Sequence, residues 1–195
     1  MSQPDEAPSI QQFFSWANRE RKYSRISPDS DERIPFNSIP PIEAYFKEKN
    51  HERLNAILIT LFEDPPPGIA EVIVKDYVAV FSILVYIGKG RHIQNFIEYN
   101  LNNQHLPFDP SHPPLDFPNS SDEGFFEKFC QQQWRFCCTI FSRDGLYNRH
   151  FRAKQILPIA DKQELGKGAS AVLYKIRIHD EYNHLHPPDI KSVCS

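Results

Sequence analysis

A short segment near the C-terminal end of the sequence carries the residues best suited to chemistry. Gly166 and Gly168 stand between two apolar stretches, so the pattern predicts a strand, a tight loop and a second strand. Glycine has no Cβ atom, and such a loop can bring its backbone N–H groups close to phosphate oxygens. Leu165 and Leu173 flank the loop and could enclose a planar base. The candidate nucleotide-binding residues are Leu165, Gly166, Lys167, Gly168, Ala169, Ser170, Ala171, Val172 and Leu173.

This segment resembles the glycine-rich loop of the eukaryotic protein kinases. That loop reads G-x-G-x-x-G-x-V, follows a hydrophobic residue and is often followed by Tyr-Lys. The matching residues are Leu165, Gly166, Gly168, Tyr174 and Lys175. Ala171 replaces the third glycine, and Leu173 replaces the valine. The region before the loop is similar to the N-terminal extension of a group of fungal kinase-domain proteins.

The resemblance covers residues 155–195 and implies that ATP with Mg²⁺ binds at the loop. In the full-length family it implies phosphorylation of proteins on serine or threonine. Kinases also need a third-strand lysine, a helix glutamate, an H-R-D loop and a D-F-G turn. Lys191 follows two prolines and an aspartate, which do not suit a central strand, so we expect it in a loop before that strand. We therefore expect a truncated or partial kinase domain that is inactive alone, and we assign no catalytic residue.

Three other patterns could suggest a site. Residues 88–90 repeat the Gly-Lys-Gly triplet, but helical spacing follows them, so a helix end is the better interpretation. Cys130, Cys137 and Cys138 precede His150 without zinc-ligand spacing, and we interpret them as packing residues. The histidines at 179, 184 and 186 are interpreted as part of a polar loop. We therefore predict no metal site.

Composition excludes several classes of protein. The chain has 195 residues, with 22 basic and 25 acidic side chains and a net charge of -3, which argues against a generic nucleic-acid binder. The longest apolar run, at residues 77–87, is shorter than the ~20 residues of a membrane span. The polar, acidic N-terminus is unlike a secretory signal, and the four cysteines are not spaced as a disulfide framework. We expect an intracellular protein, cytoplasmic or nuclear, with a protein substrate or partner.

The periodicity predicts an α+β fold with a helical module and a short antiparallel β-hairpin. We expect a disordered tail over residues 1–40, with a short helix possible at 10–17, then a helical module over 41–148 and a partial kinase domain over 149–195. Helices are predicted at 42–62 with a break at 49–51, at 69–87, at 92–101 and at 120–142. Strands are predicted at 155–160 and 173–178.

Two segments of the helical module have distinctive features. Residues 102–119 hold five prolines and are predicted to be an extended surface linker. Ser120 and Glu123 have the spacing of a capping box for the helix that follows. Its predicted buried face consists of Phe126, Cys130, Trp134, Cys137 and Phe141.

A second function stays open beside the kinase-related one. Residues 42–141 could form a non-catalytic helical module that binds another protein, with the aromatic residues of 125–136 as either core or surface.

Overall fold

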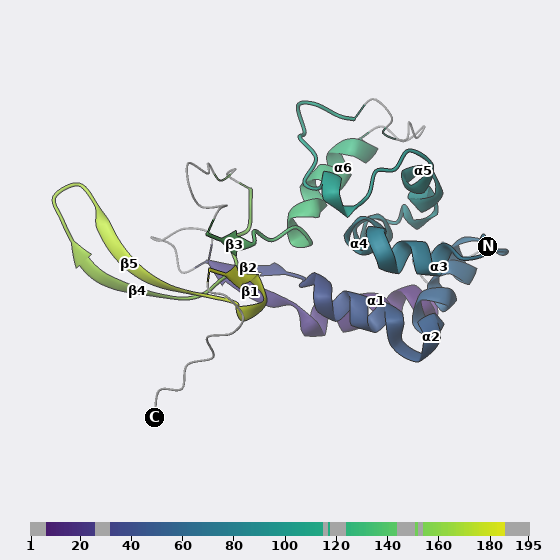
Figure 1. Cartoon of the computed structure of the whole chain (residues 1–195), viewed down its shortest axis with the longest axis horizontal. Coiled ribbons are helices and arrows are strands. Elements are labelled where there is room, and N and C mark those ends of the chain that lie inside the picture. Colours follow the sequence, from purple (N-terminus) through teal and green to yellow (C-terminus); the bar gives the residue numbers. More distant parts are fainter. Residues whose placement is uncertain are drawn as a thin grey trace. The chain divides into compact units, whose positions relative to one another are not determined.

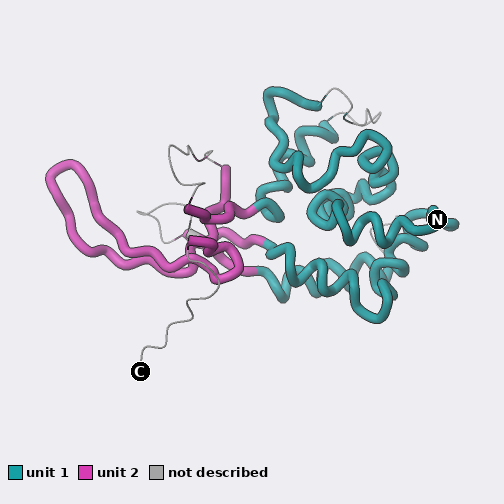
Figure 2. The backbone as a smooth tube through the Cα atoms, viewed as in Figure 1, with its two compact units in different colours: residues 1–21, 37–137 teal, residues 22–36, 138–195 magenta. Residues whose placement is uncertain are grey.

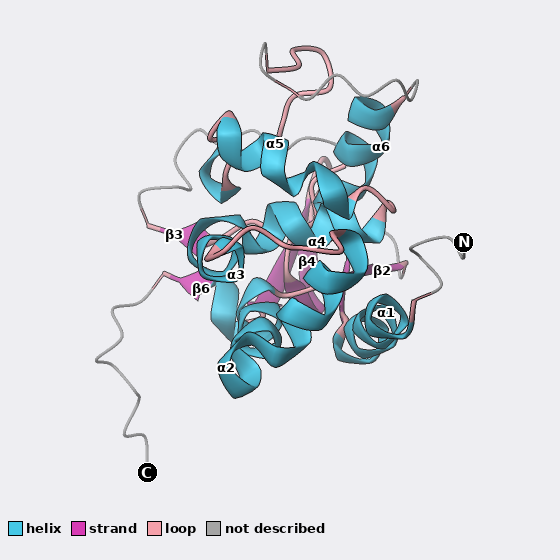
Figure 3. Cartoon of the chain, turned by 90° about the vertical axis from the view of Figure 1, so that its right-hand side faces the viewer, coloured by secondary structure: helices cyan, strands magenta, loops and turns pink. Residues whose placement is uncertain are grey.

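The computed structural model of the chain describes residues 7–25, 32–114, 117, 124–143, 151 and 154–185. It divides into two compact units, between which the chain passes three times (Figure 1, Figure 2). The helical unit comprises Met1–Arg21 and Asn37–Cys137, and the strand unit comprises Lys22–Phe36 and Cys138–Ser195. The described α-helices belong to the first unit and the described strands to the second, so the predicted mixture of helices with an antiparallel hairpin is confirmed (Figure 3).

The helical unit contains six α-helices among its described residues. They are α1 (Pro8–Glu20), α2 (Ile39–Leu61), α3 (Ile69–Val72), α4 (Val78–Tyr86), α5 (Ile93–Glu98) and α6 (Phe125–Gln132). A π-helical turn, Ile73–Tyr77, joins α3 to α4, and 3₁₀ turns occupy Gly90–His92, Asn103–His105 and Gln133–Arg135. No helix in the described part of the chain is long and apolar enough to cross a membrane.

Helix α1 contradicts the predicted disordered tail. Ile10, Phe13 and Ala17 are buried and recur at helical spacing, which gives α1 one apolar face. The Phe13 ring lies 5.4 Å from that of Phe46 on α2, measured between centroids. The polar residues after α1 suggested a tail, but this aromatic contact ties the helix to the core. The short helix predicted as possible at 10–17 is present within α1, whereas the predicted disordered tail is wrong for Lys22–Arg25 and Arg33–Phe36, which form two strands.

The apolar run at 69–87 is helical and buried, as predicted. Every residue from Val78 to Val85 is buried, so α4 is surrounded by the rest of its unit. The Asn103 side-chain oxygen accepts from the N–H groups of Ala79 at 3.0 Å and Val80 at 3.1 Å. This side chain supplies acceptors near the start of α4, where donors lack partners within the helix.

The Gly-Lys-Gly triplet at 88–90 ends α4, which confirms the helix-end interpretation. Gly88 has a φ of 72°, and the Lys89 N–H donates to the Leu84 carbonyl at 2.7 Å, as in a Schellman ending. Gly90 packs on Leu61 so closely that an added Cβ would lie 2.6 Å from the Leu61 Cδ1 atom. Both glycines therefore have a role inside the fold.

The proline-rich segment is anchored in the core and is not a surface linker, which corrects that prediction. Phe108 and Phe117 are buried among the aromatic rings of α5 and α6. The fully buried Gln133 amide accepts from the Phe108 N–H at 2.8 Å and donates to the Phe108 carbonyl at 3.0 Å. This pair of hydrogen bonds fixes the extended segment against the end of α6.

Helix α6 is much shorter than the predicted helix over 120–142. It ends at Gln132 and passes through a 3₁₀ turn, and Phe141 belongs to a strand of the other unit. The residues buried in this region are Phe125, Phe129, Cys130, Gln133, Trp134 and Phe136. Of the predicted face, Cys130, Trp134 and Phe141 are buried and Phe126 and Cys137 are partly buried, while the 3₁₀ turn buries Gln133 and Phe136 as well. Ser120 and Glu123 lie outside the described residues.

The strand unit consists of three two-stranded pairings. Its strands are β1 (Lys22–Arg25), β2 (Arg33–Phe36), β3 (Phe141–Ser142), β4 (Ile159–Lys167), β5 (Val172–Ile178) and β6 (Asn183–His184). The pairs β1–β2 and β4–β5 are antiparallel, and β3–β6 is parallel. A 3₁₀ turn, Asp180–Tyr182, follows β5, and Tyr182 packs against Phe36 of β2 with ring centroids 5.8 Å apart.

Candidate functional site

All nine predicted nucleotide-site residues lie at the end of the β4–β5 hairpin. The strand predicted at 155–160 is displaced, because residues 155–158 are not in a strand and β4 runs from Ile159 through Gly166 to Lys167, whereas the strand predicted at 173–178 matches β5 closely. The turn contains Gly168, Ala169, Ser170 and Ala171, and the Gly168 N–H donates to the Ala171 carbonyl at 2.8 Å. Val172 and Leu173 begin β5. The predicted hairpin is thus present, but its turn holds one glycine, Gly168, because Gly166 belongs to β4.

A β-bulge lies beside Gly166. Glu164 pairs with Tyr174, but Gly166 pairs with Leu173, which leaves Leu165 as an extra residue on β4. The bulge therefore places Leu165 next to the Gly166–Leu173 pair, so the two leucines predicted to contact a base are brought close along the ladder.

The outer part of the hairpin is uncovered. Leu165 is 57% exposed and Leu173 is 65% exposed, whereas Ile178 at the base of β5 is buried. Figure 2 shows this part of the hairpin extending beyond the other strands of its unit. Large apolar side chains at such exposure are typical of surfaces that meet another group.

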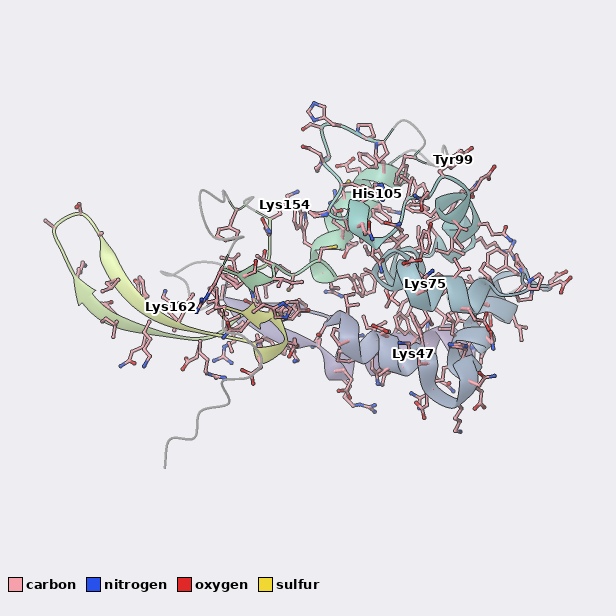
Figure 4. The ribbon with its side chains drawn as sticks, viewed as in Figure 1. Lys47, Lys75, Tyr99, His105, Lys154 and Lys162 are labelled. Carbon is pink, nitrogen blue, oxygen red and sulfur yellow. The ribbon has the colours of Figure 1, made fainter. Side chains whose placement is uncertain are left out.

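A cation–π contact stiffens one face of the hairpin. Lys162 on β4 and Tyr174 on β5 lie on the same face, and the Lys162 Nζ atom is 3.9 Å from the centre of the Tyr174 ring (Figure 4). Leu173, Lys175 and Arg177 alternate onto the opposite face. On that face Gly166 is opposite Leu173, Gln163 is opposite Lys175 and Asp161 is opposite Arg177, so the cation nearer the turn is Lys175.

Neither glycine of the hairpin is required by the fold of this chain. Gly68, Gly88 and Gly124 have positive φ angles, which favour glycine, whereas Gly166 and Gly168 do not. A Cβ added to Gly166 would meet nothing within 4 Å, and one added to Gly168 would lie 3.5 Å from the Ala171 carbonyl oxygen, an ordinary contact. Glycine within a strand weakens it and often marks a bulge, as beside Gly166, or the close approach of a ligand or another backbone.

A hollow lies in the helical unit, between α1 and α2. It has a volume of about 480 Å³ and adjoins a smaller one of about 190 Å³. The larger hollow is lined by Pro8, Gln11, Gln12, Ser15, Trp16, Arg19, Tyr45 and Arg53. We call the two together the α1–α2 groove. The Trp16 and Tyr45 rings are 4.3 Å apart between centroids, and the Arg53 guanidinium lies 4.5 Å from the centre of the Tyr45 ring. Burial raises the pKa of Tyr45, although the nearby Arg53 acts to lower it.

The wall of this groove is formed by a break in α2, at the place where the sequence predicted one. Lys49, Asn50 and His51 have φ angles of 47°, 54° and 66°, a left-handed run that costs residues other than glycine energy. After the break, Arg53 forms an ion pair with Glu48 at 2.6 Å and reaches the Tyr45 ring. Sequence reasoning identified the break but not the groove, because Trp16 was assigned to a tail. The signal that could have found it is Trp16 itself, a large aromatic residue next to the buried face of α1.

The cysteines and histidines considered from the sequence lie partly within the described residues. The described part of the chain contains no group of three or more histidine, cysteine or acidic side chains placed to hold a metal ion. Burial raises the pKa of Cys137 to about 12, which suits a packing thiol rather than a metal ligand. His150, His186 and Lys191 lie outside the described residues.

Comparisons with protein-family models, with curated proteins and with solved structures find no match to this chain. The function that follows is therefore inferred from the hairpin and the groove themselves.

Proposed function

We propose that the β4–β5 hairpin binds the phosphates of a nucleotide, as the glycine-rich loop of a protein kinase does, with ATP and Mg²⁺ as its ligand. One observation carries this: Gly166 and Gly168 occupy positions where neither backbone conformation nor packing within the chain calls for glycine. The bulge beside Gly166 is compatible with glycine but does not require it, because Gly166 has no positive φ, and a ligand that approaches the backbone closely would account for both glycines.

The contacts can be assigned more closely from the hydrogen bonds of the turn. The Gly168 N–H already donates to Ala171. The phosphate oxygens would therefore accept from the N–H groups of Ala169, Ser170 and Ala171, with the Lys167 ammonium nearby. Leu165 and Leu173 would contact the base. The function proposed for this chain is nucleotide binding alone. Phosphorylation of proteins is what the resemblance implies for full-length members of the kinase family.

Amide chemical shifts during a titration of the isotopically labelled chain test this function. ATP with Mg²⁺ should shift the amide signals of residues 166–173 saturably. Adenosine, which lacks phosphates, should leave the amides of the turn unmoved. Gly168→Val, which adds bulk beside the turn, should abolish the shifts. The hypothesis fails if ATP causes no saturable shifts at the hairpin, or if Gly168→Val responds as the parent chain does.

The α1–α2 groove favours a second function, in which the helical unit binds a peptide segment of a protein partner. Gln12, Ser15 and Arg19 are exposed along one side of α1 and can donate hydrogen bonds to the free carbonyl groups of an extended peptide. The Trp16 and Tyr45 rings offer an apolar floor of the kind on which proline-rich segments dock. We propose an extended, proline-containing peptide as the ligand.

Tryptophan fluorescence can report on this groove. In a Trp134→Phe background Trp16 is the remaining tryptophan, because the chain has two. A synthetic proline-rich peptide should change its emission saturably, and Arg53→Ala should weaken binding, whereas the exposed Arg91→Ala should not. An unchanged emission over the whole titration would exclude this ligand class.

A further inference from the structure

Three consecutive residues of β1 hold both ends of the hairpin, although they lie more than 130 positions earlier in the sequence. Ser24 contacts the backbone just before β4, at Leu157 and Ile159. Tyr23 and Lys22 contact the segment after β5. All of these residues belong to the strand unit. The outer part of the hairpin has no cover, so these contacts at its base hold it to its unit.

We call these contacts of Lys22, Tyr23 and Ser24 with the two ends of the hairpin the clamp, and Ser24 is its central residue. Its hydroxyl donates to the Leu157 carbonyl and accepts from the Ile159 N–H at 2.9 Å, so it spans the backbone on both sides of Pro158. The Ile159 N–H also donates to the Leu157 carbonyl at 2.7 Å, so the Ser24 hydroxyl ties this tight backbone turn to β1. Ser24 is only 1% exposed, so water cannot replace it readily.

The other end of the hairpin is held by two side-chain contacts. A His179 ring nitrogen lies 3.2 Å from the Tyr23 carbonyl oxygen, and Lys22 forms an ion pair with Glu181. The backbone N–H of His179 donates to the Pro158 carbonyl at 2.9 Å, and this hydrogen bond closes the hairpin at its base. The two ends are thus fixed to each other and to the same short strand.

We infer that Ser24 is a positioning residue for the nucleotide site, acting through the base of the hairpin and touching no ligand itself. This inference rests on the proposed function. With the hydroxyl in place, the base of β4 has one position relative to β1. Without it, the Ile159 N–H and the Leu157 carbonyl keep only their hydrogen bond to each other, at 2.7 Å, and lose their link to β1, so the hairpin can pivot at Pro158. The turn residues would then present their N–H groups over a wider range of directions.

Ser24→Ala in the full chain tests the inference through two independent readouts. The first is hydrogen exchange of the Ile159 amide, which we expect to be about tenfold faster, the factor that corresponds to losing a hydrogen bond of about 1.4 kcal/mol. The second is the ATP–Mg²⁺ titration, which should show weaker binding with the amide shifts still centred on residues 166–173. Ser24→Thr keeps the hydroxyl and should restore both values toward those of the parent chain. Ser142→Ala, a half-buried serine on β3, is the matched control and should change neither.

The outcomes separate the clamp from the nucleotide site. Unchanged exchange at Ile159 in Ser24→Ala would show that no clamp exists and would overturn the inference, whatever the titration gives. Faster exchange with unchanged ATP affinity would make Ser24 a purely structural residue and would equally overturn it. If the parent chain does not bind ATP, the proposed function fails and the positioning role fails with it, while the exchange readout still shows whether β1 holds the hairpin.

Discussion

Replacing single glycines by alanine should separate those that the fold needs from those that it does not. The four positions to compare are Gly68, Gly90, Gly166 and Gly168. In the strand unit, Gly166→Ala and Gly168→Ala should stabilise the closed hairpin by about 0.4–1 kcal/mol, because alanine restricts the unfolded chain and its Cβ has room. That free energy corresponds to roughly twofold to fivefold slower exchange of the β4 and β5 amides.

The two glycines of the helical unit should give the opposite sign. Gly68 has a φ of 76°, so Gly68→Ala should destabilise the unit by roughly 1–2 kcal/mol. Gly90→Ala places a Cβ 2.6 Å from the Leu61 side chain, and overpacking of this kind costs about 1–3 kcal/mol. Urea unfolding followed by the fluorescence of the buried Trp134 measures both losses.

The result that refutes this reasoning is faster amide exchange in Gly166→Ala and Gly168→Ala. Both glycines would then have a structural role in the hairpin, and the main support for a close-approaching ligand would be lost. Slower exchange together with weaker ATP binding would instead show that these positions sacrifice stability for binding.

Three further predictions concern buried polar groups. Gln133→Ala leaves the N–H and carbonyl of Phe108 without partners and should lower the free energy of unfolding by about 2–4 kcal/mol in urea melts, whereas the exposed Gln131→Ala should change it little. The partly buried Cys137 thiol, with its pKa raised to about 12, should react with iodoacetamide at pH 8 about a hundredfold or more slowly than a free cysteine, as followed by mass spectrometry of the peptide that contains it; rapid labelling of Cys137 itself would contradict this prediction. Burial raises the pKa of Tyr45, so its contribution to stability is complete below about pH 10 and is lost as the pH rises through the raised pKa. Tyr45→Phe should therefore show a smaller loss of stability between pH 9 and pH 11 in urea melts, and an equal loss in both proteins would refute the assignment.

Elements dominated by local signals could be predicted from the sequence. The run at 77–87 contains no charged residue, so the burial of Val78–Val85 could be predicted from composition, whereas Glu71 and Lys75 before it are exposed. The break at 49–51 followed from a polar triplet within apolar spacing, and the two-glycine hairpin followed from its flanking strands. The π-helical turn at Ile73–Tyr77 could not be predicted, because it depends on how the surrounding helices pack.

Predictions failed where distant residues decide the structure. Residues 22–25 look like part of a charged tail, but they become β1 because β2 and the base of the hairpin supply their partners. Phe108 and Phe117 lie among prolines, and only the rings of α5 and α6 explain their burial. The candidate hairpin was found from glycine and leucine spacing, whereas Ser24 and the α1–α2 groove needed the three-dimensional structure.

The interleaved order of the two units has a consequence for how the chain folds during synthesis. Strands β1 and β2 leave the ribosome with residues 22–36, but their partners near Leu157 follow about 120 residues later. At roughly 5–20 residues per second, that delay amounts to about 6–24 s. During this interval the exposed edges of β1 and β2 are available to chaperones or to a neighbouring nascent chain. Slow codons or stalling between residues 37 and 157 should therefore raise aggregation more than the same delay after residue 185.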